Sequence, residues 1–216
     1  MIDLVIGLAS LALIVAYELW LRLRRNRDPL HSLSAATALA RAAWVERIMA
    51  TEEHILAVQT LRNSVMTASF LASTSILVVI GLLNLAGQSK GSLSQFWHAL
   101  NVFPEVHPAL WTAKILLIVL VLLVSFFCFT IAIRLFNHVG YLVALPGDDP
   151  LRSLPPAAVA RVLNHAAGYL ALGLRAYYFA VPALFWLFGP QFAAVVSVTL
   201  IVLLSRVDLA PRDRSA

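Results

Sequence analysis

The chain has 216 residues, of which 61% are hydrophobic and only 12% are charged, and its mean hydropathy is +0.85. Soluble domains of this length hold about 45–50% apolar and about 25% charged residues, so the composition excludes an ordinary soluble protein and indicates a membrane protein. The net charge is +5. A basic soluble protein would suggest nucleic-acid binding, but these arginines flank hydrophobic blocks, which favours a role in membrane topology and no nucleic-acid partner.

Five hydrophobic blocks predict an all-α integral membrane protein with about five transmembrane helices. Four of them reach the length of about 20 apolar residues that a bilayer core requires. The fifth is shorter and follows Gly189 and Pro190, a pair that favours a helix break and restart. We treat residues 1–216 as one membrane domain, with predicted spans at residues 2–21, 63–86, 110–136, 167–188 and 190–206.

The arginines predict the orientation of these spans. The basic cluster between Arg22 and Arg27 follows the first block instead of preceding it, which predicts a retained first helix with its N-terminus outside. If every block crosses, residues 87–109 form an outer loop and the C-terminus is cytoplasmic. A re-entrant fifth block would leave four spans, but it would place Arg206, Arg212 and Arg214 on the wrong side. The predicted location is a bacterial inner membrane, with several crossings.

The segment before the second span predicts a long helix. Between Pro29 and Gly81 the sequence contains no glycine or proline and is rich in alanine and leucine. We therefore expect a cytoplasmic helix over about 34–62 that continues unbroken into the membrane. An apolar stripe at the spacing of a packing seam runs along it, and the seam can face this subunit's own segments or a neighbouring subunit. Its residues are Trp44, Ile48, Thr51, Ile55 and Val58.

Polar residues near the cytoplasmic ends of the predicted helices are the candidate site, because such residues are costly in a membrane. Arg175 lies deepest, and Glu18 is its candidate partner. A short repeat, Arg-x-x-Asn-His, occurs at Arg134 and again at Arg161, and it places His138 and His165 at similar depth on antiparallel helices. The predicted polar cluster consists of Glu18, Arg62, Asn63, Arg134, Asn137, Asn164 and Arg175.

Four interpretations of this cluster remain open. Its side chains can join helix ends, attract an anion or anionic solute into a basic cytoplasmic vestibule, or bind the headgroups of anionic lipids. As a fourth possibility, His138 and His165 suit a metal or haem site. The sequence has no Walker loop, no Gly-x-Ser-x-Gly, no Gly-x-Gly-x-x-Gly and no His-Glu-x-x-His. Apart from the possible haem or metal site it predicts no cofactor, and it leaves open whether the protein is an enzyme.

Three functional hypotheses follow. The first is a homo-oligomeric channel or permease-like protein with a basic vestibule. The second is a structural or accessory subunit of a larger membrane complex, in which the polar cluster only holds helices together. The third is haem or metal binding at the cytoplasmic ends of the third and fourth spans. The expected partners are the lipid bilayer and either further copies of this chain or other membrane subunits.

Several strings resemble a family of small polytopic membrane proteins from bacteria and plants, catalogued as domain of unknown function 599. They are Phe70-Leu-Ala-Ser-Thr-Ser-Ile-Leu77, Arg134-Leu-Phe-Asn137, and Gly173-Leu-Arg-Ala-Tyr-Tyr-Phe-Ala180 followed by Trp186 and Gly189-Pro190. The resemblance spans about Trp44 to Arg206 and implies a compact helical membrane domain with Arg175 inside a family motif. It implies no activity. The family more often has an aromatic residue at the position of His138, which weakens a metal or haem site there.

Overall fold

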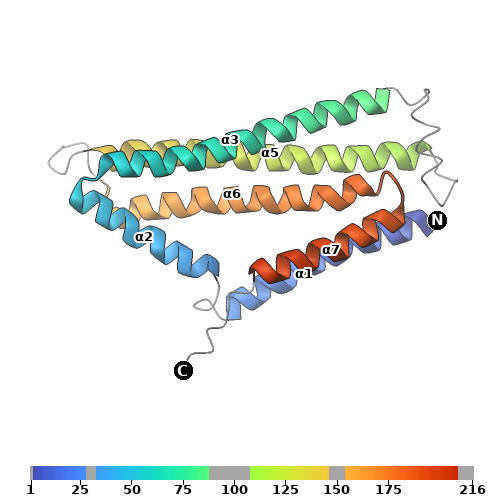
Figure 1. Ribbon diagram of the computed structural model, residues 1–216, viewed down its shortest axis with the longest axis horizontal. Coiled ribbons are helices and arrows are strands. Elements are labelled where there is room, and N and C mark those ends of the chain that lie inside the picture. Colours follow the sequence, from blue (N-terminus) through green and yellow to red (C-terminus); the bar gives the residue numbers. More distant parts are fainter. Residues whose placement is uncertain (1, 28–32, 88–107, 146–153, 209–216) are drawn as a thin grey trace. The chain divides into compact units, whose positions relative to one another are not determined.

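The described part of the chain is all-helical, as the sequence predicts. The computed structural model describes residues 2–27, 33–87, 108–145 and 154–208, and regular structure within these ranges consists of helices alone (Figure 1). In chain order the helices are α1 (Ile2–Arg27), α2 (Leu33–Thr51), α3 (His54–Gly87), α5 (Pro108–Ala144), α6 (Pro156–Phe185) and α7 (Pro190–Asp208).

Three of the described helices are long and apolar enough to cross a membrane, which identifies a membrane protein. The qualifying segments are Asp3–Leu21 in α1, His54–Gly87 in α3 and Ala109–Ala144 in α5. A shorter apolar helix covers Pro190–Arg206. The predicted span at 167–188 falls largely within α6, which is less apolar because it carries Arg161 and Arg175. The count of five crossings and their orientation therefore stay predictions.

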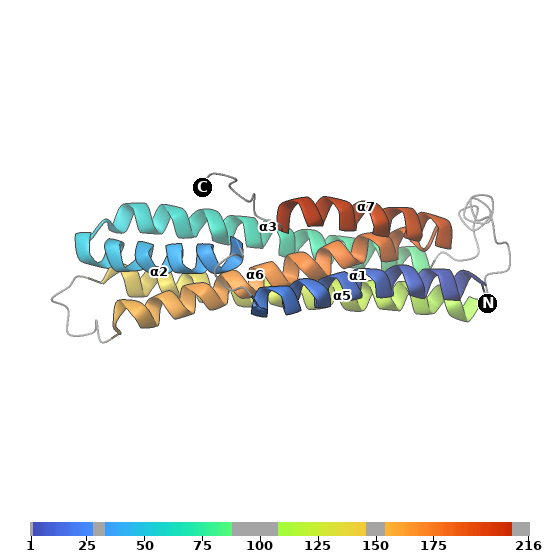
Figure 2. The ribbon, with the colours of Figure 1, turned by 90° about the horizontal axis from the view of Figure 1, so that it is seen from below.

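The predicted unbroken helix over 34–86 is wrong. Helix α2 ends at Thr51, Glu52 adopts a left-handed conformation with φ of 56°, and α3 begins at His54. The backbone N–H of His54 donates a hydrogen bond to the carbonyl of Glu52 (2.7 Å), which closes the turn. From this turn α2 runs back along the bundle instead of continuing the line of α3 (Figures 1 and 2).

Burial explains why the chain turns back. Val45, Ile48 and Met49 on α2 are buried, and a straight helix would have carried them away from the core that they join. Burying each of these side chains stabilises the fold by about 1.5–3 kcal/mol. A single left-handed non-glycine residue costs about 1–2 kcal/mol. Packing therefore outweighs the backbone cost at Glu52, and no glycine is needed at the turn.

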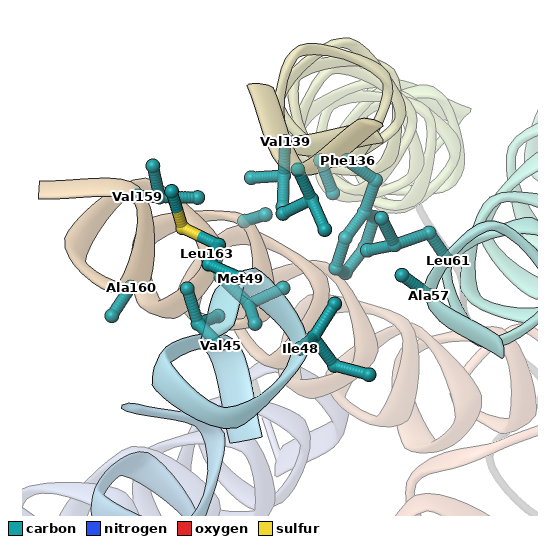
Figure 3. Close-up of a cluster of buried hydrophobic side chains, with 13 residues drawn as sticks. Val45, Ile48, Met49, Ala57, Leu61, Phe136, Val139, Val159, Ala160 and Leu163 are labelled. Atoms are coloured by element: carbon teal, nitrogen blue, oxygen red, sulfur yellow. The ribbon is translucent and has the colours of Figure 1, made fainter. Parts of the chain in front are cut away.

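The described helices form two compact units. Unit 2 comprises Ser34–Ile76 and Val124–Arg175. Its core brings α2 together with the first half of α3, the second half of α5 and the first half of α6 (Figure 3). The contributing residues recur at helical spacing, so each helix presents one stripe to the core. They include Val45, Ile48, Ala57, Leu61, Phe136, Val139, Val159 and Leu163.

The residues of the predicted seam separate at the turn. Ile48 is only 1% exposed and lies in the unit 2 core, and Trp44 is half-buried beside it. Ile55 and Val58 follow the turn and are 78% and 48% exposed. One end of the stripe thus packs within this subunit, and packing of the other end on a neighbouring subunit stays a prediction.

Unit 1 comprises Met1–Leu33, Leu77–Leu123 and Ala176–Ala216. Helices α1 and α7 pack against each other within it. As predicted, α7 starts at Pro190, directly after Gly189, whose φ of 145° favours glycine. The core of this unit contains Leu11, Val79, Leu82, Ile115, Ile118, Leu122, Ala180, Ala183, Trp186, Leu187 and Ala193.

Candidate functional site

A buried ion pair joins three helices of unit 1. Lys114 Nζ on α5 lies 2.8 Å from Asp3 Oδ2 on α1 and donates a hydrogen bond to Asp3 Oδ1 at 3.1 Å. Trp186, directly after the end of α6, donates from Nε1 to the same Oδ1 at 3.2 Å. The residues Asp3, Lys114 and Trp186 are 5%, 2% and 3% exposed. We call these three residues the charged latch.

Further contacts hold the lysine of the latch in place. Lys114 Nζ donates a second hydrogen bond to the carbonyl of Trp186 (3.3 Å) and lies 4.8 Å from the centre of a Trp186 ring, a cation–π distance. Gly7, one turn after Asp3, leaves the space that the indole occupies, since a Cβ there would lie 1.9 Å from Trp186 Cε2. Asp3 also lies in the first turn of α1, where the helix dipole favours a carboxylate.

Sequence reasoning missed the charged latch. It gave Asp3 and Lys114 no role and named Trp186 only among the residues of the family resemblance. The sequence does show that each charged residue of the latch stands alone in an apolar stretch. Lys114 is the only charged residue between Pro108 and Ile133, and Asp3 is the only one before Glu18. Two opposite charges in separate apolar helices each need a partner, so the sequence marks both residues without identifying them as a pair.

In unit 2, a second polar contact joins α2 to α6. Arg41 Nε donates a hydrogen bond to Asn164 Oδ1 at 2.7 Å, and Asn164 Nδ2 donates to the carbonyl of Ala38 at 3.3 Å. Burial lowers the pKa of Arg41 from its ordinary value, although a guanidinium keeps its charge in proteins. We call Arg41, Asn164 and Ala38 the α2 tie. Asn164 belongs to the predicted polar cluster, whereas Arg41 was missed because it precedes the predicted membrane spans.

Two more polar contacts cross between helices of unit 2. His54 Nδ1, at the start of α3, lies within hydrogen-bond distance (3.0 Å) of the carbonyl of Val143 on α5. Ser125 Oγ on α5 is buried and donates to the carbonyl of Gly173 on α6 at 2.6 Å. Gly173 opens the Gly-Leu-Arg-Ala-Tyr-Tyr-Phe string, so one residue of that string has a packing role.

The other residues of the predicted cluster are mostly exposed. Asn63, Arg134 and Asn137 are exposed, as are Arg62 and both candidate metal ligands, His138 and His165. Glu18 and Arg175 are half-buried, and they belong to different units, so their pairing stays a prediction. Within the described residues, no group of three or more His, Cys, Asp or Glu side chains could hold a metal ion. A haem or metal site at His138 and His165 remains untested.

Helix geometry places the exposed arginines of unit 2 away from its core. On α5 the buried positions Ala132, Phe136 and Val139 face the core, and Arg134 lies about half a turn from its neighbours in that stripe. Arg161 has the same relation to Val159 and Leu163 on α6. These side chains therefore point outward from the bundle and do not converge within the subunit.

A family model described as "Protein of unknown function, DUF599" matches residues 5–212. The chain belongs to this family. The match covers nearly the whole sequence and confirms the resemblance that the strings in α3, α5 and α6 indicate. No curated protein and no solved structure matches this DUF599 chain.

The DUF599 match contains most of the polar contacts described above. Lys114 and Trp186 of the charged latch lie inside it, as do Arg41 and Asn164 of the α2 tie. Asp3 lies two residues before the matched segment begins. The family supplies no activity for these residues, so any role for them must come from their chemistry.

Proposed function

We propose that this DUF599 protein is a structural or accessory subunit of a larger membrane complex, located in a bacterial inner membrane. One observation carries the proposal: several of the polar side chains that turn inward join one helix to another. The charged latch does so in unit 1, and the α2 tie and the Ser125 hydrogen bond do so in unit 2. A solute pathway would instead require inward polar groups to face a cavity.

The energetics of the charged latch support a structural role. Taking two charges out of water costs several kcal/mol per ion, and their attraction does little more than offset that cost. Removing only one partner of such a pair destabilises a protein by about 3–5 kcal/mol. A buried pair therefore fixes one arrangement of α1, α5 and α6 more than it adds net stability.

A second candidate is a homo-oligomeric channel or permease-like protein with a basic vestibule for an anion. The exposed face of α3 favours it, because Gln59, Asn63 and Ser73 lie there within a helix apolar enough to cross a membrane. Lipid tails offer such side chains no hydrogen-bond partners, whereas a second copy or a water-filled axis would. The same face would suit a partner subunit under the first proposal.

Isolation of the native complex separates the two candidates. The full chain, tagged and expressed at its native level, is extracted in mild detergent and examined by native mass spectrometry. The accessory proposal expects other membrane proteins at a fixed ratio to this chain. One defined homo-oligomer, together with chloride efflux from phosphatidylcholine vesicles that Arg62→Gln abolishes, would contradict it and favour the channel.

Variants of the charged latch test its role within that experiment. Lys114→Met leaves the Asp3 carboxylate buried without its charged partner, so we expect loss of the complex and a lower midpoint of thermal unfolding. The double variant Asp3→Asn with Lys114→Met removes both charges and should recover most of that loss. Thr130→Ala, at an exposed position on α5 whose hydroxyl bonds only its own helix, is the control. A double variant as poorly assembled as the single one would contradict the role assigned to the latch.

A further inference from the structure

Two helices of unit 2 present the same exposed pair of side chains. Arg134 and His138 lie one turn apart on α5, and Arg161 and His165 lie one turn apart on α6; all four are exposed. Residues four apart share one face of a helix, so each arginine and its histidine can contact the same group. A third exposed arginine, Arg62, lies on α3. None of these residues takes part in the charged latch or the α2 tie.

The three arginines occupy corresponding positions along their helices. Arg62 lies 25 residues before Gly87 at the end of α3, Arg134 lies 26 residues after Pro108, and Arg161 lies 24 residues before Phe185. At a rise of 1.5 Å per residue, each is about 36–39 Å along its helix from that end. The hydrocarbon core of a bilayer is about 30 Å thick, and about 40–45 Å with headgroups. A crossing that starts at those ends reaches the headgroup layer at all three arginines.

The histidines lie one turn to either side of the arginines. Because α5 and α6 run antiparallel, His138 lies one turn beyond Arg134 and His165 lies one turn before Arg161, as counted from the far helix ends. Their positions are about 45 Å and about 30 Å along the helices, so His138 lies at the outer edge of the headgroup region and His165 at the edge of the hydrocarbon core.

On α5 the exposed surface changes character at Arg134. The large exposed apolar side chains before it are Leu116, Leu120, Val124, Phe127 and Ile131, and the exposed Asn137 and His138 follow it. An apolar surface that ends at an exposed arginine is the pattern of a helix leaving the hydrocarbon core. On α3 exposed apolar side chains occur on both sides of Arg62, so this pattern is confined to α5.

We propose that Arg62, Arg134 and Arg161 form an arginine girdle that binds the phosphate groups of anionic phospholipids, with His138 and His165 as additional hydrogen-bond donors. A guanidinium binds phosphate through two parallel hydrogen bonds and keeps its charge, which suits this ligand. The girdle fixes the depth of unit 2 in the bilayer. It concerns the lipid-facing side of the subunit, so it agrees with the accessory proposal, whereas a channel that conducts through Arg62 would exclude Arg62 from the girdle.

Lipid selectivity tests the girdle. The full chain in neutral detergent is titrated with phosphatidylglycerol or phosphatidylcholine, and bound lipids are counted by native mass spectrometry. We expect phosphatidylglycerol to be preferred and each Arg→Gln substitution at 62, 134 or 161 to weaken that binding about fivefold. Arg→Lys at the same positions keeps the charge but loses the paired hydrogen bonds, so it should retain only part of that binding. Arg47→Gln, an exposed arginine on α2, is the matched control.

Three results would overturn the proposal. The first is an equal affinity for the two lipids. The second is a preference for phosphatidylglycerol that survives all three Arg→Gln substitutions. The third is that inorganic phosphate stabilises the protein as much as phosphatidylglycerol does, which would indicate a site for a soluble anion. If the triple variant does not fold, the single variants carry the comparison.

A depth measurement provides a second test that does not depend on affinity. In a Cys128→Ala background, single cysteines replace Arg62, Arg134 or Arg161 and carry a fluorescent label, and spin-labelled lipids quench it in vesicles. We expect all three labels at headgroup depth, and labels at Phe70 and Phe127 within the hydrocarbon core. Arginine positions that differ in depth by more than about 5 Å, roughly one helical turn, would contradict the girdle.

Discussion

Gly173 allows α5 and α6 to approach closely within unit 2. A Cβ at this position would lie 2.6 Å from Cε1 of Phe129, whose ring is fully buried. The Gly173 carbonyl also accepts the hydrogen bond from Ser125. An added methyl group must therefore displace a packed ring and disturb a buried hydrogen bond at once.

We expect Gly173→Ala to destabilise the protein by about 1–3 kcal/mol, the usual cost of overpacking a core. Gly168→Ala on the same helix is the matched control, because nothing lies within 4 Å of its added Cβ. Alanine is the better helix former by about 1 kcal/mol, so this control should be neutral or stabilising. The measurement is the free energy of unfolding in mixed micelles. Equal effects at the two glycines would show that the close approach to Phe129 has no energetic weight.

Some of the residue-level chemistry was predictable and some was not. Asn164 belongs to the predicted polar cluster, but its partner Arg41 lies 123 residues away and in a separate helix. Charge pairs such as Asp3 with Lys114 depend on which helices are neighbours, and a single sequence does not encode this in any local pattern. Hydropathy located the helices; it did not reveal which faces meet.

At the scale of elements, the turn between α2 and α3 is the main difference from expectation. Neither glycine nor proline marks it, and the residues on both sides favour helix. A tertiary effect, the burial of Val45, Ile48 and Met49, decides the conformation at Glu52. Helix ends that carry glycine and proline, such as the restart at Pro190, were predictable because their signal is local.

The left-handed conformation at Glu52 predicts that, unlike at an ordinary helical position, a glycine variant is more stable than an alanine variant. Both Glu52→Gly and Glu52→Ala remove the side chain, but only glycine adopts φ of 56° without strain. We expect the glycine variant to be more stable than the alanine variant by about 1 kcal/mol. The order should reverse at Glu46, within α2, where alanine is preferred. The measurement is the unfolding free energy of the four variants. If alanine were the more stable substitution at both Glu52 and Glu46, the turn at Glu52 would be contradicted.

At the scale of the whole molecule, the all-helical membrane character and the family follow from composition and from a few strings. Composition suffices because a bilayer imposes apolar helices about 20 residues long on any chain that crosses it. The number of crossings is harder to derive. Helix α6 carries Arg161 and Arg175, and α7 has only a short apolar run, so hydropathy alone does not establish either one as a span.

Cysteine labelling tests the predicted five crossings. In a Cys128→Ala background, single cysteines replace Ser32, Ser89, Ser153 or Ser215, and intact cells are treated with a membrane-impermeant maleimide. Five spans with the N-terminus outside predict that only the cysteine at 89 reacts before permeabilisation. A reaction at 215 in intact cells would mean that residues 190–206 do not complete a crossing.

The charged latch also constrains the order in which the protein can be built. Asp3 precedes Lys114 by 111 residues and Trp186 by 183 residues. Until α5 emerges from the ribosome, α1 carries a carboxylate that lacks its charged partner, and only after α6 emerges is the set complete. The ends of α1, α5 and α6 can therefore lock together only after α6 has been synthesised. Biogenesis would then proceed with α1 held loosely until that point.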